Sequence, residues 1–281
     1  MGSLERLTLT DPDPKQDVFA FWQAAACGES LYLDAEGNDY ERQASRRYGL
    51  EPYIEAFAGF SDAVGKDVLE IGVGLGADHQ RFAEAGARLT GIDLTDRAIE
   101  HTGRRLAQLG LKSFLRVADA EALPFPDDAF DLVYSWGVIH HLPNTAQAAR
   151  EIMRVLRPGG QFCVMVYHRK SVVGFMLWLR YALLRGRITM SLSEVYAEYL
   201  ESPGTKAFSR SEAVALFAEA QELEVRVVLT HGDLLEGPAG QRHRGIALAV
   251  ARRIWPRRLI RTLFPDHGLY LLIKGRKPTV G

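Results

Sequence analysis

The sequence predicts an α/β protein built around a mostly parallel β-sheet. Short apolar runs that are typical of buried strands recur along the chain, and segments with helical spacing alternate with them. Several of these runs end abruptly at glycine or at an acidic residue, where a ligand can approach the backbone. The 281 residues, 47% of them hydrophobic, are sufficient for one such domain with additional helices.

The first strand–helix–strand unit spans residues 68–95. An apolar strand from Val68 ends at a run of three alternate glycines, a helical pattern begins at Ala77, and a second strand stops on Asp93. Glycine lets the backbone come close to a ligand where any Cβ would collide, and the acid can accept hydrogen bonds from both hydroxyls of a ribose. The unit predicts nucleotide binding. The pattern Gly-x-Gly-x-x-Ala from Gly72 also satisfies the loose dinucleotide fingerprint, so NAD remains an alternative at this point.

Three further features favour a different nucleotide. Glu70 places a carboxylate beside the glycine turn, where a cationic amino group would be welcome. A third strand, 114–117, leads into Ala118-Asp119-Ala120-Glu121, with an acid positioned for an adenine amino group. A fourth strand, FDLVYS, runs into SWGVIHHLP and brings aromatic and histidine side chains to the same edge of the sheet.

Together these segments resemble the class I S-adenosylmethionine (SAM) methyltransferases. The motifs E-x-G-x-G-x-G, GID, ADAExLPF, FDLVYSWGVIHH and RVLRPGG occur in that order between residues 48 and 167. The resemblance implies a Rossmann-like seven-stranded sheet, mostly parallel with an antiparallel last strand, with helices on both faces and a helical cap. It also implies S-adenosyl-L-methionine as the cofactor. The expected cofactor-binding residues are Glu70, Gly72, Gly74, Gly76, Asp93, Leu94, Asp119, Ala120, Glu121, Ser135 and Trp136.

The N-terminal part of the chain is expected to form a helical lid, residues 1–60. Residues 1–16 are polar and predict an arm, 18–26 predict a short apolar helix, and helices interrupted near Gly49 and Pro52 follow. Such helices commonly cover the methionine end of the cofactor in the family. Tyr40, Arg46, Arg47 and Tyr48 are candidates for that contact, and a solvated helix face is the alternative.

The remaining chain divides into three expected parts: the SAM-binding core at 61–168, a helical cap insertion at 169–208, and the C-terminal part of the core at 209–281 with an inserted helix at 231–263. Thr95 or Asp96 caps a helix that ends at Gly110, and another helix spans 145–156. A fifth strand (161–168), an apolar helix (171–184), a helix opened by a capping box at 209–212, a sixth strand (225–230), a basic helix kinked at Pro256 and a last strand (268–275) complete the chain.

Two adjacent histidines are the candidates for catalysis. His140 and His141 follow the fourth strand, and an imidazole with a pKa near neutrality suits deprotonation of a hydroxyl or a carbon acid. The alternative is that the pair only packs or orients the loop. Methyl transfer itself requires mainly in-line positioning, so the acceptor atom (O, N or C) stays open. No ligand spacing indicates a metal site.

Substrate recognition is expected from the additions to the core. His168 and His231 follow the fifth and sixth strands, Trp178 lies in the apolar helix, and Arg242 and His243 belong to a polar cluster. An apolar wall opposite cations suits a small molecule with an apolar body and a polar or anionic head, such as a specialised metabolite. The alternative is that the apolar helix forms a homodimer interface and the arginines are solvated.

Composition and charge argue against several classes of protein and binding partner. The net charge of −1 does not call for nucleic acid, two cysteines argue against a disulfide framework, and the N-terminus lacks a signal-peptide pattern, so we expect a cytoplasmic protein. The basic helix at 246–263 is most plainly a surface helix packed on the core, with contact to a membrane surface as the alternative. A SAM-binding protein without turnover, or a SAM-dependent transferase of another group, is the alternative function.

Overall fold

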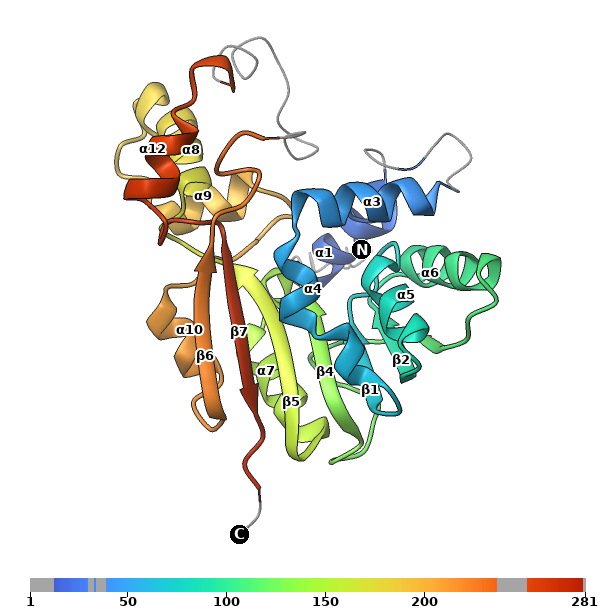
Figure 1. The fold of residues 1–281 in the computed structure, drawn as a ribbon. Helices are drawn as coiled ribbons and strands as arrows, with labels where there is room; N and C mark the ends of the chain where they lie inside the picture. The colour runs from blue at the N-terminus through green and yellow to red at the C-terminus, as the bar shows by residue number, and fades with distance from the viewer. Residues whose placement is uncertain (1–12, 30–32, 34–38, 237–251, 280–281) are drawn as a thin grey trace, which may run out of the picture.

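A seven-stranded mixed sheet forms the centre of the computed structural model, which describes residues 13–29, 33, 39–236 and 252–279 (Figure 1). The strand order is β3-β2-β1-β4-β5-β7-β6. The strands are β1 (Asp67–Ile71), β2 (Arg88–Asp93), β3 (Phe114–Val117), β4 (Phe130–Trp136), β5 (Leu156–Tyr167), β6 (Gln221–Val228) and β7 (Tyr270–Arg276).

The sheet reverses its winding direction at β1. This strand pairs in parallel with β2 on one side and with β4 on the other, whereas β7 runs antiparallel to both β5 and β6. The expected Rossmann-like sheet with an antiparallel last strand is therefore confirmed. Ligands bind such sheets at the carboxyl ends of the strands, where the strand order reverses, so the topology directs attention to the ends of β1 and β4.

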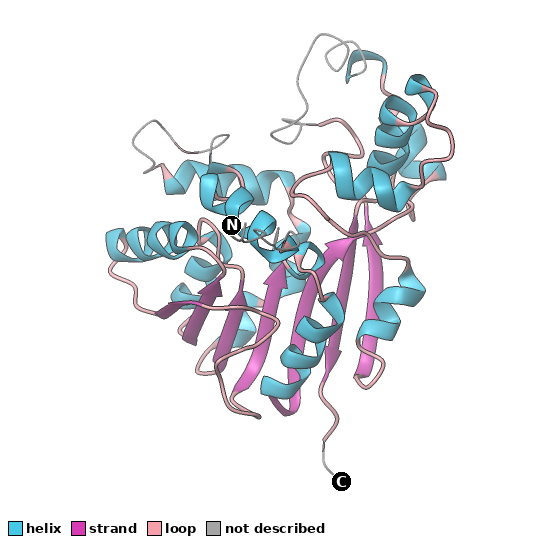
Figure 2. Cartoon of the chain, turned by 180° about the vertical axis from the view of Figure 1, so that it is seen from behind, coloured by secondary structure: helices cyan, strands magenta, loops and turns pink. Residues whose placement is uncertain are grey.

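Helices cover both faces of the sheet (Figure 2). The helices are α1 (Pro14–Ala24), α3 (Tyr40–Leu50), α4 (Tyr53–Ala58), α5 (Ala77–Glu84), α6 (Asp96–Gln108), α7 (Thr145–Val155), α8 (Val172–Tyr181), α9 (Leu192–Tyr199), α10 (Arg210–Leu216) and α12 (Arg257–Leu263), with short 3₁₀ turns η1 (Phe60–Ala63), η2 (Ile139–His141) and η3 (Leu183–Arg185). Residues of α7 and α10 share one core with the sheet, and residues of α4, η1 and α5 share the core on the other face.

Strand β5 shows how the sequence pattern produces the two cores. Its successive side chains alternate between the faces: Phe162 and Val164 join the core under α7, whereas Cys163 and Met165 join the core under α4. All four are buried. Cys163 is thus a small core residue, as its apolar strand context predicts.

Three predicted starts were wrong by four residues or more, because hydrogen bonds extend each element toward its N-terminus. Strand β5 begins at Leu156 rather than at 161, since Leu156 already pairs with Phe130 of β4. Helix α1 starts at Pro14 rather than at residue 18, since Asp13 caps it by accepting from the Lys15 N–H. Strand β6 begins at Gln221 rather than at 225, because its pairing with β7 starts opposite Arg276.

Helices α8, α9 and α12 gather beyond the ends of β5, β6 and β7, on the opposite side of the sheet from the C-terminus (Figure 1). The kink predicted at Pro256 is confirmed for the described residues, since residues 252–254 are helical and α12 begins at Arg257. Within the ranges that the structure describes, every helix is too short or too polar to cross a bilayer.

Candidate cofactor and acceptor site

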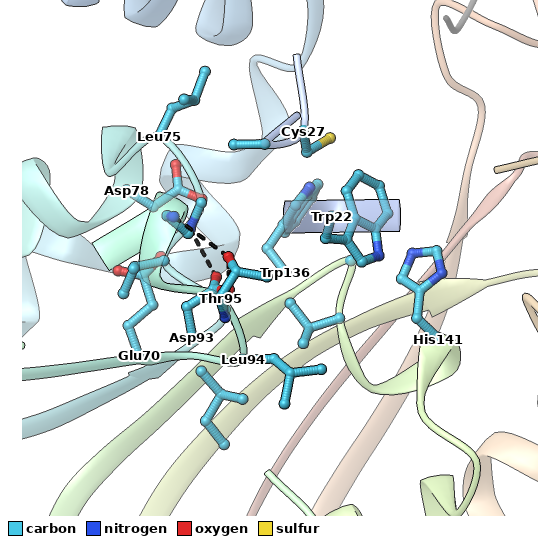
Figure 3. Close-up of a pocket in the computed structure, with 18 of the residues that line it drawn as sticks. Trp22, Cys27, Glu70, Leu75, Asp78, Asp93, Leu94, Thr95, Trp136 and His141 are labelled. Atoms are coloured by element: carbon cyan, nitrogen blue, oxygen red, sulfur yellow. Dashed lines mark hydrogen bonds between the residues drawn. The ribbon is translucent and has the colours of Figure 1, made fainter. Parts of the chain in front are cut away.

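A cavity of about 220 Å³ lies at the carboxyl ends of β1, β2, β4 and β5. Its floor comes from the loops that follow these strands, and its cover comes from α1 and α3. Figure 3 shows its two ends, with Glu70 and Asp93 on one side and Trp22 and His141 on the other. Residues of both N-terminal helices therefore line the site, and their role as a lid over the cofactor stays a prediction.

The glycine turn after β1 forms the wall nearest the first two strands. Gly72 has φ 81°, and a Cβ there would lie 2.1 Å from Cγ2 of Val138, so only glycine fits beside the β4 loop. A Cβ on Gly74 would meet nothing within 4 Å. The backbone of Gly74 is consequently open to the cavity, where a ligand can contact it directly.

Asp93 lies at the end of β2, next to this turn. Its carboxylate accepts the Gly74 N–H at 3.2 Å, and its other oxygen accepts the N–H and hydroxyl of Thr95 at 3.0 and 2.9 Å (Figure 3). Burial raises the pKa of Asp93, and these hydrogen bonds oppose the rise. A carboxylate has about four acceptor positions, and three are used here, so one is free for a ribose hydroxyl. The second ribose hydroxyl would take the position of the Gly74 N–H, which makes the longest of the three bonds.

Glu70 lines the same cavity but is engaged with a histidine that the sequence analysis did not single out. Its Oε2 lies 2.8 Å from Nδ1 of His79, whose Nε2 lies 2.8 Å from the Ser113 hydroxyl. Ser113 donates its own proton to the carbonyl of Leu89, so Nε2 must be the protonated nitrogen of a neutral His79. Burial raises the pKa of Glu70 well above its usual range and lowers that of His79 to about 3, which places a shared proton on the carboxyl group.

A buried ion pair fastens the lid to the first helix of the core. Arg47 on α3 donates from Nε and Nη2 to the two oxygens of Asp78 at 3.0 and 2.5 Å, and Tyr48 and Tyr134 donate to the same carboxylate. Although burial alone would raise the pKa of Asp78, Arg47 and the hydroxyls lower it. Of these residues, the sequence analysis named Arg47 and Tyr48 as candidates but missed Asp78. The sequence feature that could have indicated Asp78 is its position as a lone acid in the first turn of α5.

His141 is the histidine that lines the cavity. Its Nδ1 lies 2.8 Å from the Ser202 hydroxyl and 3.1 Å from that of Thr205. Thr205 donates its proton to the carbonyl of Ser202, so its oxygen accepts at Nδ1, whereas the Ser202 hydroxyl can donate or accept there. A hydrogen on Nδ1 of the neutral ring lets both hydroxyls accept. The lone pair of Nε2 is thereby left to take up a proton.

Two groups lie close to that nitrogen. Oε2 of Glu201 is 3.5 Å from Nε2 and also accepts the Tyr167 hydroxyl at 2.6 Å, and the Trp22 ring packs edge-on against the imidazole. Burial lowers the pKa of His141 to about 3, rather than the near-neutral value expected for a general base, so the ring is neutral at pH 7 and a weaker base than the sequence analysis assumed. Glu201 can stabilise the imidazolium that forms when Nε2 takes a proton. The sequence analysis missed Glu201, because only the folded cap brings it to the site.

The other candidate base is placed differently. His140 is fully buried, stacks on Tyr167 with ring centroids 4.1 Å apart, and does not line the cavity.

The same two histidines and Glu201 also carry the kinds of atom that bind metal ions. Ligand atoms of His140, His141 and Glu201 lie within 4.8 Å of one another. That is wider than the spacing of ligands around one zinc ion, which is about 3–4 Å for bonds of 2.0–2.2 Å.

Several expected cofactor residues lie beside the cavity rather than in its wall. Gly76, Leu94, Ala120 and Trp136 line it, whereas Asp119, Glu121 and Ser135 do not. Lys15 on α1 bridges Asp119 and Glu121 with contacts of 2.6 Å, and Ser135 is fully buried with no hydrogen-bond partner for its hydroxyl.

The expected substrate residues require correction. Trp178 packs inside the cap with Leu177 and Val195 and donates to the carbonyl of Met190 at 2.8 Å, so it forms part of the cap core and not a wall of the cavity. His168 is buried and bonds to the carbonyl of Gly268, and His231 also lies away from the cavity.

The polar cluster with Arg242 and His243 lies outside the described residues. Sequence reasoning overestimated the apolar helix because an apolar segment that packs on its own neighbours has the same pattern as one that lines a pocket. The residues that do line the acceptor end come from α1, β5, β7 and the loop after α9: Trp22, Cys27, Met165, Tyr167, Glu201 and Tyr270.

The fold and the cavity define a Rossmann-like domain that can hold a nucleoside with a ribose at Asp93. Comparison with known proteins identifies the type: residues 69–164 match the family model described as methyltransferase domain. The chain therefore resembles a methyltransferase domain over this stretch, which holds the glycine turn, Asp93 and the two adjacent histidines.

Curated relatives agree with that assignment over part of their length. The chain is 35% identical over 98 residues to the sterol 4-C-methyltransferase of Caenorhabditis elegans, covering 34% of this chain and 29% of that protein. It is 31% identical over 168 residues to the 27-O-demethylrifamycin SV methyltransferase of Amycolatopsis mediterranei, covering 56% and 60%. The matches thus span less than two thirds of each relative.

Solved structures share the fold. The phosphoethanolamine N-methyltransferase 2 of Haemonchus contortus, in complex with phosphomonomethylethanolamine and S-adenosylhomocysteine, has a TM-score of 0.57 at 20% identity, covering 82% of this chain and 53% of that one. The [4+2]-cyclase SpnF has a TM-score of 0.53 at 18% identity, covering 89% and 86%. At these identities the likeness shows the fold alone.

Proposed function

We propose that the protein transfers the sulfonium methyl group of SAM to a small-molecule acceptor. One observation carries the proposal: a single cavity connects the glycine turn and Asp93 to His141, Tyr167 and Glu201. The first group suits the nucleoside and amino-acid parts of SAM, and the second supplies a proton acceptor at the same edge of the sheet. SAM supplies the electrophilic methyl group.

Some residues of the cavity would bind the cofactor, and others would take part in proton transfer. Asp93 would bind the ribose, and the open backbone of Gly74 lets the cofactor lie against the turn. The side chains of Trp22, Met165 and Tyr270 give the acceptor end an apolar character and exclude water. An acceptor hydroxyl or carbon acid would give its proton to Nε2 of His141, beside Glu201.

The apolar lining supports an acceptor with an apolar body. The names of two curated relatives specify such molecules, a sterol and a rifamycin, as substrates of those two proteins. The expected anionic head depended on Arg242 and His243, so we propose only the apolar body. The atom that accepts the methyl group, O, N or C, stays open.

Transfer can be tested without knowing the acceptor. Cell extract is incubated with the protein and SAM carrying an isotopically labelled methyl group, and labelled products are found by mass spectrometry. We expect a labelled small molecule with wild-type protein, and about 10²–10⁴-fold slower labelling with His141→Gln if the acceptor must lose a proton.

The result also separates the alternatives. A protein that binds SAM but labels nothing would be a SAM-binding protein without turnover, and the proposal would fail. Labelling that is equally fast with His141→Gln would leave positioning alone as the mechanism and favour an amine acceptor.

A further inference from the structure

Exposed apolar side chains are concentrated in two segments of the cap. Fifteen large hydrophobic residues of the described chain are exposed, and nine of them lie in residues 169–190 and 252–264. They are Phe175, Leu179, Leu183, Leu184, Ile188, Ile254, Leu259, Leu263 and Phe264. We refer to these nine residues and the basic residues of the same segments as the cap face. A cluster of this kind on a soluble surface marks an interaction site.

The cap face is strongly basic. Residues 169–190 contain five Lys and Arg and no acidic residue, and 252–264 contain another five and none. The chain has 34 basic and 35 acidic residues, so the remainder carries 24 basic against 35 acidic ones. Four of these ten basic residues, Arg169, Arg187, Arg257 and Arg261, pair with acids of neighbouring segments. Within the described chain, no carboxylate pairs with Arg185 or Arg258.

The two segments lie together in the fold. The N–H of Val172, the first residue of α8, donates to the carbonyl of His267 at 2.8 Å, and the His267 ring contacts those of Phe175 and Phe264. Both views show α8 and α12 at the same end of the molecule (Figures 1 and 2). The side chains of the two segments, which are about 80 residues apart in the sequence, therefore lie in one region of the structure.

The most exposed part of the cap face is a turn between α8 and α9. Residues 183–189 are all exposed, and Leu184 and Ile188 keep 75% and 64% of their surface accessible. Gly186, with φ 71°, ends the short η3 helix and turns the chain back. The turn presents Arg185 and Arg187 between the apolar side chains.

We infer that the cap face binds the surface of a lipid bilayer that contains anionic lipids. Apolar side chains beside arginines match the layered chemistry of such a surface, where acyl chains lie below negative headgroups. Helices α8 and α12 have 10 and 7 residues, and a bilayer requires about 20, so the helices would lie on the membrane.

Charge argues against a second copy of the chain on this face. A two-fold interface brings identical patches together, and basic residues would then face basic residues with no acid in either segment. An anionic surface neutralises the same charges.

The location of the cap face also suits the chemistry of the site. The chain that follows α9 leaves the cap at Leu200 and immediately places Glu201 in the wall of the cavity. A bilayer bound at the cap would hold an apolar acceptor near that end of the site. Lipid binding itself does not depend on methyl transfer, so the two proposals can fail separately.

The test is sedimentation of the full chain with vesicles. We expect wild-type protein to sediment with vesicles of phosphatidylcholine and phosphatidylglycerol in equal parts, to bind pure phosphatidylcholine at least about tenfold more weakly, and to dissociate as salt is raised. Leu184→Asp with Ile188→Asp, and separately Arg185→Glu with Arg258→Glu, should each weaken binding at least about tenfold.

Matched control variants lie on the rest of the surface. Val64 is exposed to 67% and Lys112 is also exposed, both outside the cap, so Val64→Asp and Lys112→Glu should sediment like wild type. Circular dichroism and SAM binding check that every variant is folded.

Three results would overturn the inference. The first is wild-type protein that stays in solution with anionic vesicles. The second is a loss of binding in the Val64→Asp and Lys112→Glu controls as large as in the cap variants. The third is a wild-type dimer in solution that Leu184→Asp with Ile188→Asp converts to a monomer without any vesicle binding, which would assign the face to a second copy.

Discussion

At the scale of single residues, we expect cofactor binding to depend most on the side chain of Asp93. Asp93→Ala removes a carboxylate acceptor, and one hydrogen bond to a charged group contributes roughly 1.5–3 kcal/mol. We expect the dissociation constant for SAM, measured by calorimetry, to rise at least about tenfold.

Asp96 provides the control for that substitution, because it is an exposed acid three residues further on, in the first turn of α6. Asp96→Ala should bind SAM like wild type. An unchanged constant in Asp93→Ala would remove the ribose assignment.

His141 makes a second residue-scale prediction, which concerns its tautomer. A proton on Nδ1 lets the hydroxyls of both Ser202 and Thr205 accept from the ring. Long-range ¹⁵N NMR at pH 7 should therefore show a neutral His141 ring with Nε2 unprotonated, identified by the signal that disappears in His141→Gln. Observation of the Nε2–H tautomer would show that the ring cannot act as the base toward the cavity.

At the scale of elements, two glycines of the turn after β1 have different roles: Gly72 is needed for packing, and we expect Gly74 to contact the ligand. Gly72→Ala should destabilise the fold by about 1–3 kcal/mol, because the new Cβ collides with Val138 at a positive φ. Val138→Ala in the same chain should restore part of the loss.

Gly74→Ala should instead act on the ligand. No atom lies within 4 Å of its Cβ position, so the new methyl group would project into open space next to the cavity. Urea unfolding and SAM titration should show a smaller loss of stability than Gly72→Ala and a larger loss of affinity. Equal stability losses with unaltered SAM affinity in both variants would contradict the assigned roles.

The sequence predicted the elements of the core more accurately than those of the cap. The turn from Gly72 to Gly76, the Thr95 cap and the capping box at Ser209 are local hydrogen-bond or steric patterns, and the structure confirms them. The role of Trp178 depends on which neighbours its helix meets, and this is not encoded locally. Glu201 likewise reaches His141 across 60 residues of chain.

At the scale of the whole molecule, buried imidazoles couple the stability of the fold to pH, among them His79, His140 and His141. Burial lowers the pKa of His140 well below 6.5, with His141 and Lys206 adding to the effect, and burial lowers that of His141 to about 3. Below pH 6.5 these histidines are protonated in the unfolded chain but stay neutral in the folded chain. Their contribution to the free energy of unfolding is therefore complete above pH 6.5 and is lost as the pH falls toward 3.

Urea unfolding at pH 7 and pH 5 measures this coupling. The free energy of unfolding should fall between the two values, and His140→Leu should reduce that fall by about 2 kcal/mol, since each unit of pKa difference corresponds to about 1.4 kcal/mol. A variant with the same pH dependence as wild type would mean that His140 is not held neutral by the fold.

The central claim is that one cavity holds the cofactor's ribose at Asp93 and its sulfur toward His141. A crystal structure of the protein grown with S-adenosylhomocysteine tests it most directly. We predict that both ribose hydroxyls bond to Asp93, that the ligand lies against Gly74, and that its sulfur faces the part of the cavity lined by His141, Tyr167 and Glu201. A ligand bound elsewhere, or one whose sulfur points away from His141, would contradict the account.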